Sequence, residues 1–176
     1  MRAWLSFAYI TCLLLCFTHQ SLSQIGATKD ELIKRYGPCQ PGAALRSERN
    51  ERAYQGVIDF GEDCTIRSED LVMTIMFKDG KAVAFDYRIA IPYSDSLVSG
   101  DRWRKLWELD LLRLESMAIP NARWVSIRTD SHLRQSRTKD SKVFSYYFAD
   151  GHDERHHLLV QTAAVDAVFR KTEKIK

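Results

Sequence analysis

Two neighbouring segments near the middle of the chain carry the pattern of a β-hairpin. Residues 71–77 form a nearly continuous apolar run, and residues 81–91 alternate apolar and polar side chains. Between them lies Asp79-Gly80, a two-residue signal for a tight hairpin turn. Residues 53–60 also alternate, which is typical of a strand that is buried on one side. The pattern predicts a three-stranded antiparallel meander, with residues 61–70 as a connection.

A short helix is predicted before this meander. Thr28 and Glu31 have the spacing of a capping box, in which each side chain accepts a hydrogen bond from the backbone of the first turn. Gly37 and Pro38 mark the end of the helix. A helix of two turns is not stable alone in water. We therefore expect it to dock on the meander through the apolar side chains that share one face, which are Leu32, Ile33 and Tyr36.

The pattern changes to a helical period over residues 101–117. Apolar residues recur there at intervals of three and four, which predicts an amphipathic helix whose tryptophans anchor it in the core. Strands are predicted at residues 123–128, 143–148 and 157–162, with a polar loop over 129–142. Residues 163–171 fit either a helix or a continued strand. The stripe of the amphipathic helix consists of Trp103, Leu106, Trp107, Leu111 and Leu114.

Together these elements predict an α+β fold. A short helix packs on an antiparallel meander over residues 24–92, and a second helix with further antiparallel strands follows over residues 93–176. The two parts are expected to form either two lobes or one domain with a continuous sheet.

The first 23 residues predict a secretory signal peptide. Arg2 precedes an apolar run of about 15 residues, and the small residues Ser21 and Ser23 place a cleavage site before Gln24. The run is shorter than the roughly 20 residues of a membrane-spanning helix, although retention as an anchor is the alternative. No later stretch is apolar enough to span a membrane. We expect a protein exported to the bacterial periplasm or cell envelope.

The predicted export affects the expected redox state of the cysteines. Cys39 and Cys64 remain after cleavage, and an even pair in an oxidising compartment predicts a disulfide. The alternative is two buried free thiols.

Charge and motifs exclude several functions. The formal net charge is only +3, too balanced for a nucleic-acid-binding protein. The chain has none of the common hydrolase signatures, and Glu108 and Asp110 fall on the solvent side of the predicted helix. We predict that the protein is not an enzyme and has no cofactor.

Metal binding is the alternative function. Residues 150–157 gather histidines and carboxylates that are possible ligands for zinc or copper. The candidate ligands are His152, His156 and His157. A solvated hairpin loop is the simpler interpretation, because adjacent His156 and His157 would point to opposite faces of a strand.

The first part of the chain resembles the BamE-like (SmpA/OmlA) domain family of bacterial envelope proteins. The resemblance spans residues 25–91 and implies an α+β two-layer domain with a scaffold or binding role. No functional residue is implied, and the chain has neither a clear lipobox nor an obvious second helix before the sheet. The matching positions are Gly26, Ala27, Thr28, Glu31, Leu32, Gly37, Pro38, Phe77, Gly80, Lys81 and Val83.

The predicted function is therefore a non-enzymatic scaffold or protein-binding module whose partner is another envelope protein. Residues 143–148 carry aromatic side chains on both faces. If they form an edge strand, a partner strand can pair with it; if they lie between helices, both faces are core.

Overall fold

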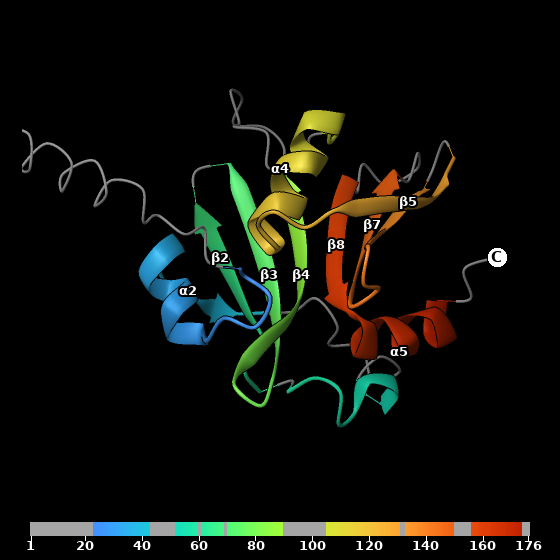
Figure 1. Cartoon of the computed structure of the whole chain (residues 1–176). Coiled ribbons are helices and arrows are strands. Elements are labelled where there is room, and N and C mark those ends of the chain that lie inside the picture. The colour runs from blue at the N-terminus through green and yellow to red at the C-terminus, as the bar shows by residue number, and fades with distance from the viewer. Residues whose placement is uncertain are drawn as a thin grey trace, which may run out of the picture.

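Eight strands form one antiparallel sheet in the computed structural model of the chain (Figure 1). The structure describes residues 23–42, 52–59, 61–68, 70–89, 105–130, 133–149 and 156–173. The strand order is β1-β2-β3-β4-β8-β7-β6-β5. The strands are β1 (Gln40–Pro41), β2 (Cys64–Ser68), β3 (Leu71–Lys78), β4 (Lys81–Ile89), β5 (Trp124–Thr129), β6 (Leu133–Thr138), β7 (Val143–Ala149) and β8 (His156–Thr162). The helices discussed below are α2 (Lys29–Tyr36), α4 (Glu108–Ala118) and α5 (Ala163–Glu173).

The sheet contains the same arrangement twice. The first half is α2 followed by the meander β1 to β4, and the second is α4 followed by the meander β5 to β8. The last strands of the two meanders, β4 and β8, pair antiparallel, so the sheet continues from one half into the other. The predicted α+β class is confirmed, whereas the sequence shows no repeat that would reveal the duplicated arrangement.

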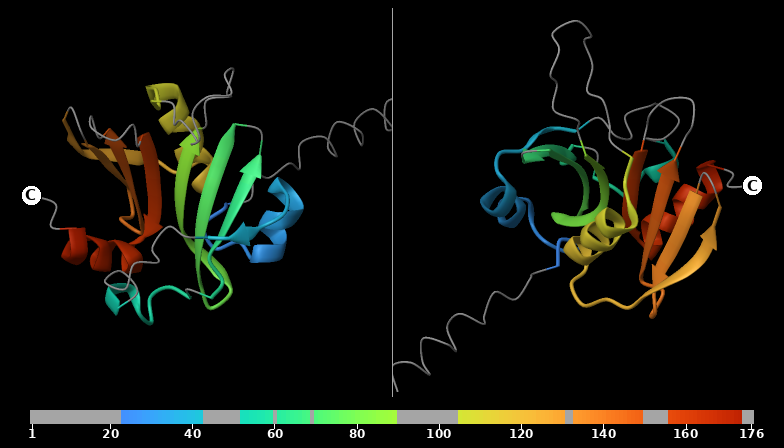
Figure 2. Two further views of the ribbon diagram at one scale, coloured as in Figure 1. Left: turned by 180° about the vertical axis from the view of Figure 1, so that it is seen from behind. Right: turned by 90° about the horizontal axis from the view of Figure 1, so that it is seen from above.

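The two faces of the sheet carry separate hydrophobic clusters. On one face, Leu32 of α2 and Leu114 of α4 belong to the same cluster as Phe85 of β4 and Val160 of β8. Figure 2 shows α4 lying against the strands where the two halves meet. On the other face, α5 and the segment at residues 53–58 cover a second cluster, which includes Tyr54, Ile58, Tyr146, Val165 and Phe169. The apolar sides of α2 and α4 are therefore buried on one face of the sheet, and that of α5 on the other.

Helix α2 begins and ends where the sequence predicts. Thr28 is the N-cap, its hydroxyl accepts from the Glu31 backbone N–H at 3.3 Å, and the Glu31 carboxylate accepts from the Thr28 N–H at 2.7 Å. The predicted capping box is thus confirmed. Hydrogen bonds from Thr28 hold the pKa of Glu31 below its usual value. Gly37 takes a φ of 105°, which favours glycine, and stops the helix.

The predicted hairpin turn is also confirmed. Asp79 and Gly80 both have positive φ, 51° and 69°, and connect β3 to β4. A turn with two positive φ angles matches the right-handed twist of its strands, which explains the sequence preference. The Asp79 N–H donates to the Asp59 carboxylate, so the turn is also tied to the segment that covers the second cluster.

The first strand of the predicted meander was placed wrongly. Residues 52–54 form a helical turn and residues 55–58 a tight reversal, in which Gly56 has a φ of 75°. The reversal lets Tyr54 and Ile58 both reach the second cluster, an i, i+4 relation that mimics strand alternation in the sequence. The strand that pairs with β3 is β2, in the segment predicted to be a connection.

The second helix is shorter than predicted. It starts at Glu108, and the Asp110 carboxylate accepts a hydrogen bond from the backbone N–H of Trp107 at 2.8 Å, which fixes Trp107 as the N-cap. Trp107 is 62% exposed, so the prediction that it anchors the helix in the core is wrong. Leu106, Leu111 and Leu114 are buried as predicted. Trp103 lies outside the described residues.

Part of the polar segment at 129–142 is not a loop but the strand β6. Two of its buried polar side chains have hydrogen-bond partners on β7: Gln135 donates to the Tyr146 hydroxyl at 3.0 Å, and the Thr138 hydroxyl accepts from the Val143 N–H at 3.2 Å. Residues 163–171, left open between helix and strand, belong to α5.

The segment before α2 ties the two halves together. The backbone N–H groups of Gln24 and Ile25 donate to the carbonyl of Ala118, the last residue of α4, at 3.0 and 3.2 Å. The Gln24 side chain is fully buried, where its amide accepts from Tyr87 and donates to the Tyr36 hydroxyl at 2.7 Å. Burial, and then the neighbouring Tyr36, raises the pKa of Tyr87, which keeps its hydroxyl a donor. Among the described residues, no helix combines the length and apolarity needed to cross a bilayer.

Replacing Leu32 tests how α2 is held. Leu32 is fully buried, whereas its neighbour Ile33 is half-buried. We predict that Leu32→Ala lowers the free energy of unfolding by about 3 kcal/mol, because it removes core contacts and leaves a cavity. The control Ile33→Ala should cost less than half as much in the same urea titration. Equal costs would contradict this packing.

Candidate functional site

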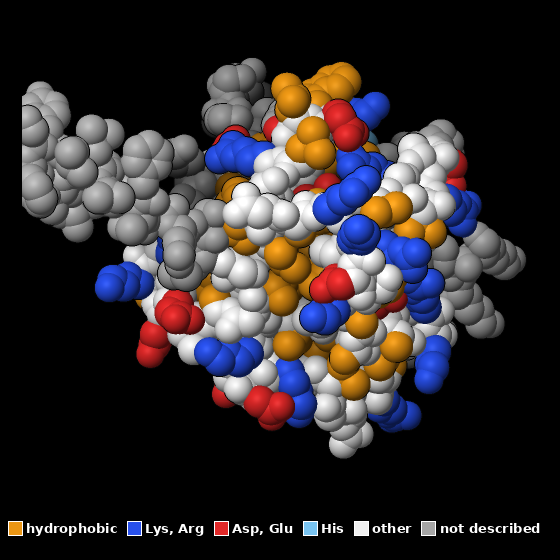
Figure 3. Space-filling model, in the orientation of Figure 1, with side chains coloured by type: hydrophobic (Ala, Val, Ile, Leu, Met, Phe, Trp, Pro, Cys, Tyr) orange, Lys and Arg blue, Asp and Glu red, His pale blue; other side chains and the backbone are white. Residues whose placement is uncertain are grey.

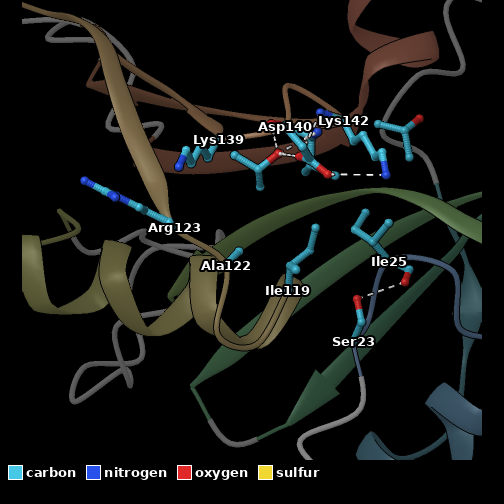
Figure 4. Close-up of a pocket in the computed structure, with 11 residues that line it drawn as sticks. Ser23, Ile25, Ile119, Ala122, Arg123, Lys139, Asp140 and Lys142 are labelled. Atoms are coloured by element: carbon cyan, nitrogen blue, oxygen red, sulfur yellow. Dashed lines mark hydrogen bonds and ion pairs between the residues drawn. The ribbon is translucent and has the colours of Figure 1, made fainter.

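A pocket of about 580 Å³ opens between the two halves of the molecule (Figure 4). Its walls come from the segment before α2, the turn after α4, the β6–β7 hairpin and the end of β8. Apolar atoms make up most of its lining. The lining residues are Ser23, Ile25, Ile119, Ala122, Arg123, Thr138, Lys139, Asp140, Lys142, Val143 and Thr162.

Backbone hydrogen bonds hold the walls of this pocket in place. The Gln24 N–H donates to Ala118 O at 3.0 Å and fixes the first segment against the end of α4. After α4, Asn121 turns the chain with a φ of 60°. The Lys139 N–H then donates to the Arg123 carbonyl at 2.9 Å, which joins the turn to the hairpin.

The charged side chains of the pocket are predominantly basic. Asp140 is its single acid, and its carboxylate is already engaged: it accepts from the Thr138 hydroxyl at 2.6 Å and lies 3.5 Å from Lys142 Nζ. The hydrogen bond from Thr138, followed by that from the Lys142 backbone, lowers the pKa of Asp140. Arg123 and Lys139 are exposed and lie at the same end of the pocket, where the Arg123 side chain extends outward from the other lining residues (Figure 4). Neither side chain has a hydrogen-bond or ion-pair partner among the described residues.

A second surface feature is the outer side of α4. Trp107, Leu109 and Leu112 are 62%, 80% and 45% exposed, while the inner side of the same helix is buried. Figure 3 shows hydrophobic side chains gathered over α4 at the top of the molecule. We call Trp107, Leu109 and Leu112 the outer α4 patch. Lys105 lies 5.5 Å from the Trp107 ring and adds a positive charge at its rim.

Beneath α4, a buried carboxylate contacts the sheet. Glu115 is 1% exposed, accepts from the Ser145 hydroxyl at 2.5 Å and lies 3.5 Å from the Arg134 guanidinium, which also bonds Glu108 at 2.8 Å. Burial raises the pKa of Glu115 against the opposing effects of Ser145 and Arg134. The hydroxyl of Ser136, across from Ser145, is buried without a partner. Because α4 covers the cluster, we interpret it as structural.

Two further polar clusters lie on the other face of the sheet, away from α4. Tyr146 donates to Asp166, which also accepts from Arg170 at 2.8 Å, and burial followed by the Asp166 hydrogen bond raises the pKa of Tyr146. Asp86 lies 2.9 Å from His157 Nδ1. Burial disfavours ionisation of Asp86, but His157 and then Arg88 outweigh it and hold the pKa of Asp86 below its usual value.

The predicted metal ligands do not form one site in the described part of the chain. His156 and His157 open β8 and point to opposite faces: His156 Nδ1 lies 3.2 Å from the Tyr147 hydroxyl, and His157 stacks on Phe148. His152 lies outside the described residues. No group of three or more potential ligands occurs among the described residues.

The two cysteines are neighbours but are not bonded. β1 pairs Pro41 with Cys64, which brings Cys39 next to Cys64. Both are free thiols in the structure. Burial, and then the hydrogen bond of the Cys64 thiol to Cys39, raises the pKa of Cys64 to about 12. The Cys39–Cys64 disulfide stays a prediction.

The aromatic strand at 143–148 is not at an edge. β7 pairs with β6 and β8, and its two faces contribute Tyr147 and Tyr146 to the two clusters. The edge strands of the described sheet are β1 and β5. Neither the pocket nor the outer α4 patch was predicted from the sequence. The signal for the outer α4 patch was present, since Leu109 and Leu112 fall outside the predicted apolar stripe.

Comparisons with known proteins add little. No known protein family and no curated protein matches the chain. Among solved structures, it is similar to a cysteine-rich secretory protein from Staphylococcus aureus, with 10% sequence identity and a TM-score of 0.39. The match covers 82% of this chain and 46% of that one, so the chain spans less than half of that structure. A likeness this weak supports no argument.

The buried carboxylate predicts a pH dependence. A folded-state pKa of Glu115 above its unfolded value means that the folded protein binds more protons, so stability falls as pH rises above about 4.5 through the raised value. We predict that Glu115→Gln reduces this slope in urea titrations across pH 4 to 8. The control Glu62→Gln, an exposed carboxylate on the connection before β2, leaves the Glu115 cluster intact and should keep the slope. Identical slopes in wild type and Glu115→Gln would contradict the assignment.

Proposed function

We propose that the protein is an exported, non-enzymatic module of the bacterial envelope that binds another protein through the outer α4 patch. The observation that carries the proposal is the 80% exposure of Leu109 between two other exposed apolar side chains. Export is supported by the signal-like residues 1–23.

Helix α4 has two apolar sides. Leu111 and Leu114 already pack the helix on the sheet, whereas Leu109 is largely exposed and Leu112 is about half exposed. Burying the exposed part of Leu109 in an interface would contribute about 2 kcal/mol, and burying that of Leu112 about 1 kcal/mol. Trp107 beside them is the residue type that most often dominates binding energy.

The geometry favours a partner with an apolar groove. Leu109 and Leu112 are one helical turn apart, and Trp107 precedes them at the N-cap. This spacing suits insertion of a helix face into a groove. The two acidic side chains in the first turn of α4 already have partners. The Asp110 carboxylate accepts from the Trp107 N–H, and Glu108 forms an ion pair with Arg134. Arg113, which is exposed and follows Leu112 on the same helix, adds a positive charge beside the patch and favours an acidic group on the partner.

The family resemblance belongs to the same proposal. We infer that the first half is a BamE-like unit with a short helix packed on a meander. The residues that support this are the Thr28–Glu31 capping box and the Asp79-Gly80 turn. No observation favours the metal-binding alternative, because His156 and His157 have different neighbours on opposite faces of the sheet.

Crosslinking in envelope fractions tests the docking role. We predict that Leu109→Ser/Leu112→Ser reduces recovery of the partner that wild type captures by about tenfold or more, the effect of losing two buried leucines. The matched control is Val125→Ser/Ile127→Ser, which alters two apolar side chains on β5 that are 40% and 46% exposed.

Two outcomes would contradict the proposal. One is recovery of the wild-type protein alone in repeated experiments. The other is an equal loss of partner in both double variants, which would indicate a nonspecific effect of surface hydrophobicity. Because all four side chains are exposed, neither variant should lose more than about 0.5 kcal/mol of stability per site.

A further inference from the structure

We propose that the pocket between the two halves binds a small organic acid with an apolar body. The proposal goes beyond the docking role of the outer α4 patch and does not rest on it. The pocket volume of about 580 Å³ lies within the range of small-molecule sites.

The apolar part of such a ligand would meet side chains from separate segments. Ile25 comes from the segment before α2, Ile119 and Ala122 from the turn after α4, and Val143 from the start of β7. In Figure 4, Ile25 and Ile119 lie on the side of the cavity opposite the β6–β7 hairpin. Together they offer an apolar lining to a ligand, and burying an alkyl group there is favourable.

The acidic group would meet Arg123 and Lys139. These cations lie at the same end of the pocket without partners among the described residues, whereas Asp140 is occupied by Thr138 and Lys142. An anion that reaches this end gains charge-assisted hydrogen bonds without breaking an existing ion pair. A cation would find no free carboxylate, because Asp140 is the single acidic residue of the lining. The charges therefore select acids over bases and neutral molecules.

The pocket depends on the contact between the two halves. Residues of the first segment and of the β6–β7 hairpin are far apart in the sequence. They come together because the backbone N–H groups of Gln24 and Ile25 donate to the carbonyl of Ala118 at the end of α4. A ligand in the pocket would contact both halves, so it would stabilise the folded protein over the unfolded one.

The test compares octanoate with octan-1-ol, which shares its chain but carries no charge. In an NMR titration of amide shifts in the purified protein, we expect octanoate to bind at least about tenfold more tightly, with shifts at Ala122 and Lys139. Added salt should weaken octanoate binding and leave octanol unchanged. Arg123→Gln/Lys139→Gln should reduce octanoate affinity to the level of octanol.

Two further variants complete the test. Lys34→Gln/Arg113→Gln removes the same charge from positions outside the pocket lining and should keep wild-type binding. Ala122→Trp fills the pocket and should abolish binding of both ligands.

Four results would overturn the proposal: no saturable octanoate binding, equal affinity for octanoate and octanol, unchanged affinity in Arg123→Gln/Lys139→Gln, or shifts confined to α4. Binding of a peptide with a C-terminal leucine, without octanoate binding, would overturn it in favour of a peptide site. Failure of the partner experiment on α4 would leave this test unaffected, since the two surfaces share no residue.

Discussion

The pairing of β4 with β8 is the contact on which the rest of the structure depends. Four residue pairs define its register: Ala84 with Gln161, Phe85 with Val160, Asp86 with Leu159 and Tyr87 with Leu158. Phe85 and Val160 face one cluster, and Ala84 and Leu159 face the other. Two four-stranded meanders thereby share both of their cores. Neither meander buries its last strand without the other.

Contacts on each face reinforce this pairing. On one face of the sheet, Asp86 of β4 contacts His157 of β8. On the other face, α4 packs against β8, and the carbonyl of its last residue, Ala118, accepts hydrogen bonds from the segment before α2. The pocket forms between these same segments. Both proposed surfaces therefore depend on elements that bridge the halves: α4 displays its outer patch because its inner side is committed to the shared core.

The sequence was most informative where local chemistry decides the structure. The Thr28 cap, the Gly37 stop and the Asp79-Gly80 turn each act within a few residues, and each prediction was confirmed. Apolar periodicity failed at residues 53–60, because Tyr54 and Ile58 reach one cluster through a reversal and not an extended strand.

Long-range partners explain the other differences. Strand β6 has the composition of a loop, and hydrogen bonds with Tyr146 and Val143 on the neighbouring strand help to make burial of Gln135 and Thr138 favourable. The pocket also could not be predicted, since its walls meet through tertiary contacts. The exposed Leu109 could have been, because it lies off the apolar stripe of its own helix.

The most direct test of the shared core is equilibrium unfolding in urea, under reducing conditions, followed by two probes. Alkylation of the buried Cys64 thiol in a Cys39→Ser variant reports on the first half, and fluorescence of Trp107 and Trp124 reports on the second. Because the halves share both clusters, the two probes should give one coincident transition. Two separate midpoints, with either half unfolding before the other, would contradict the account.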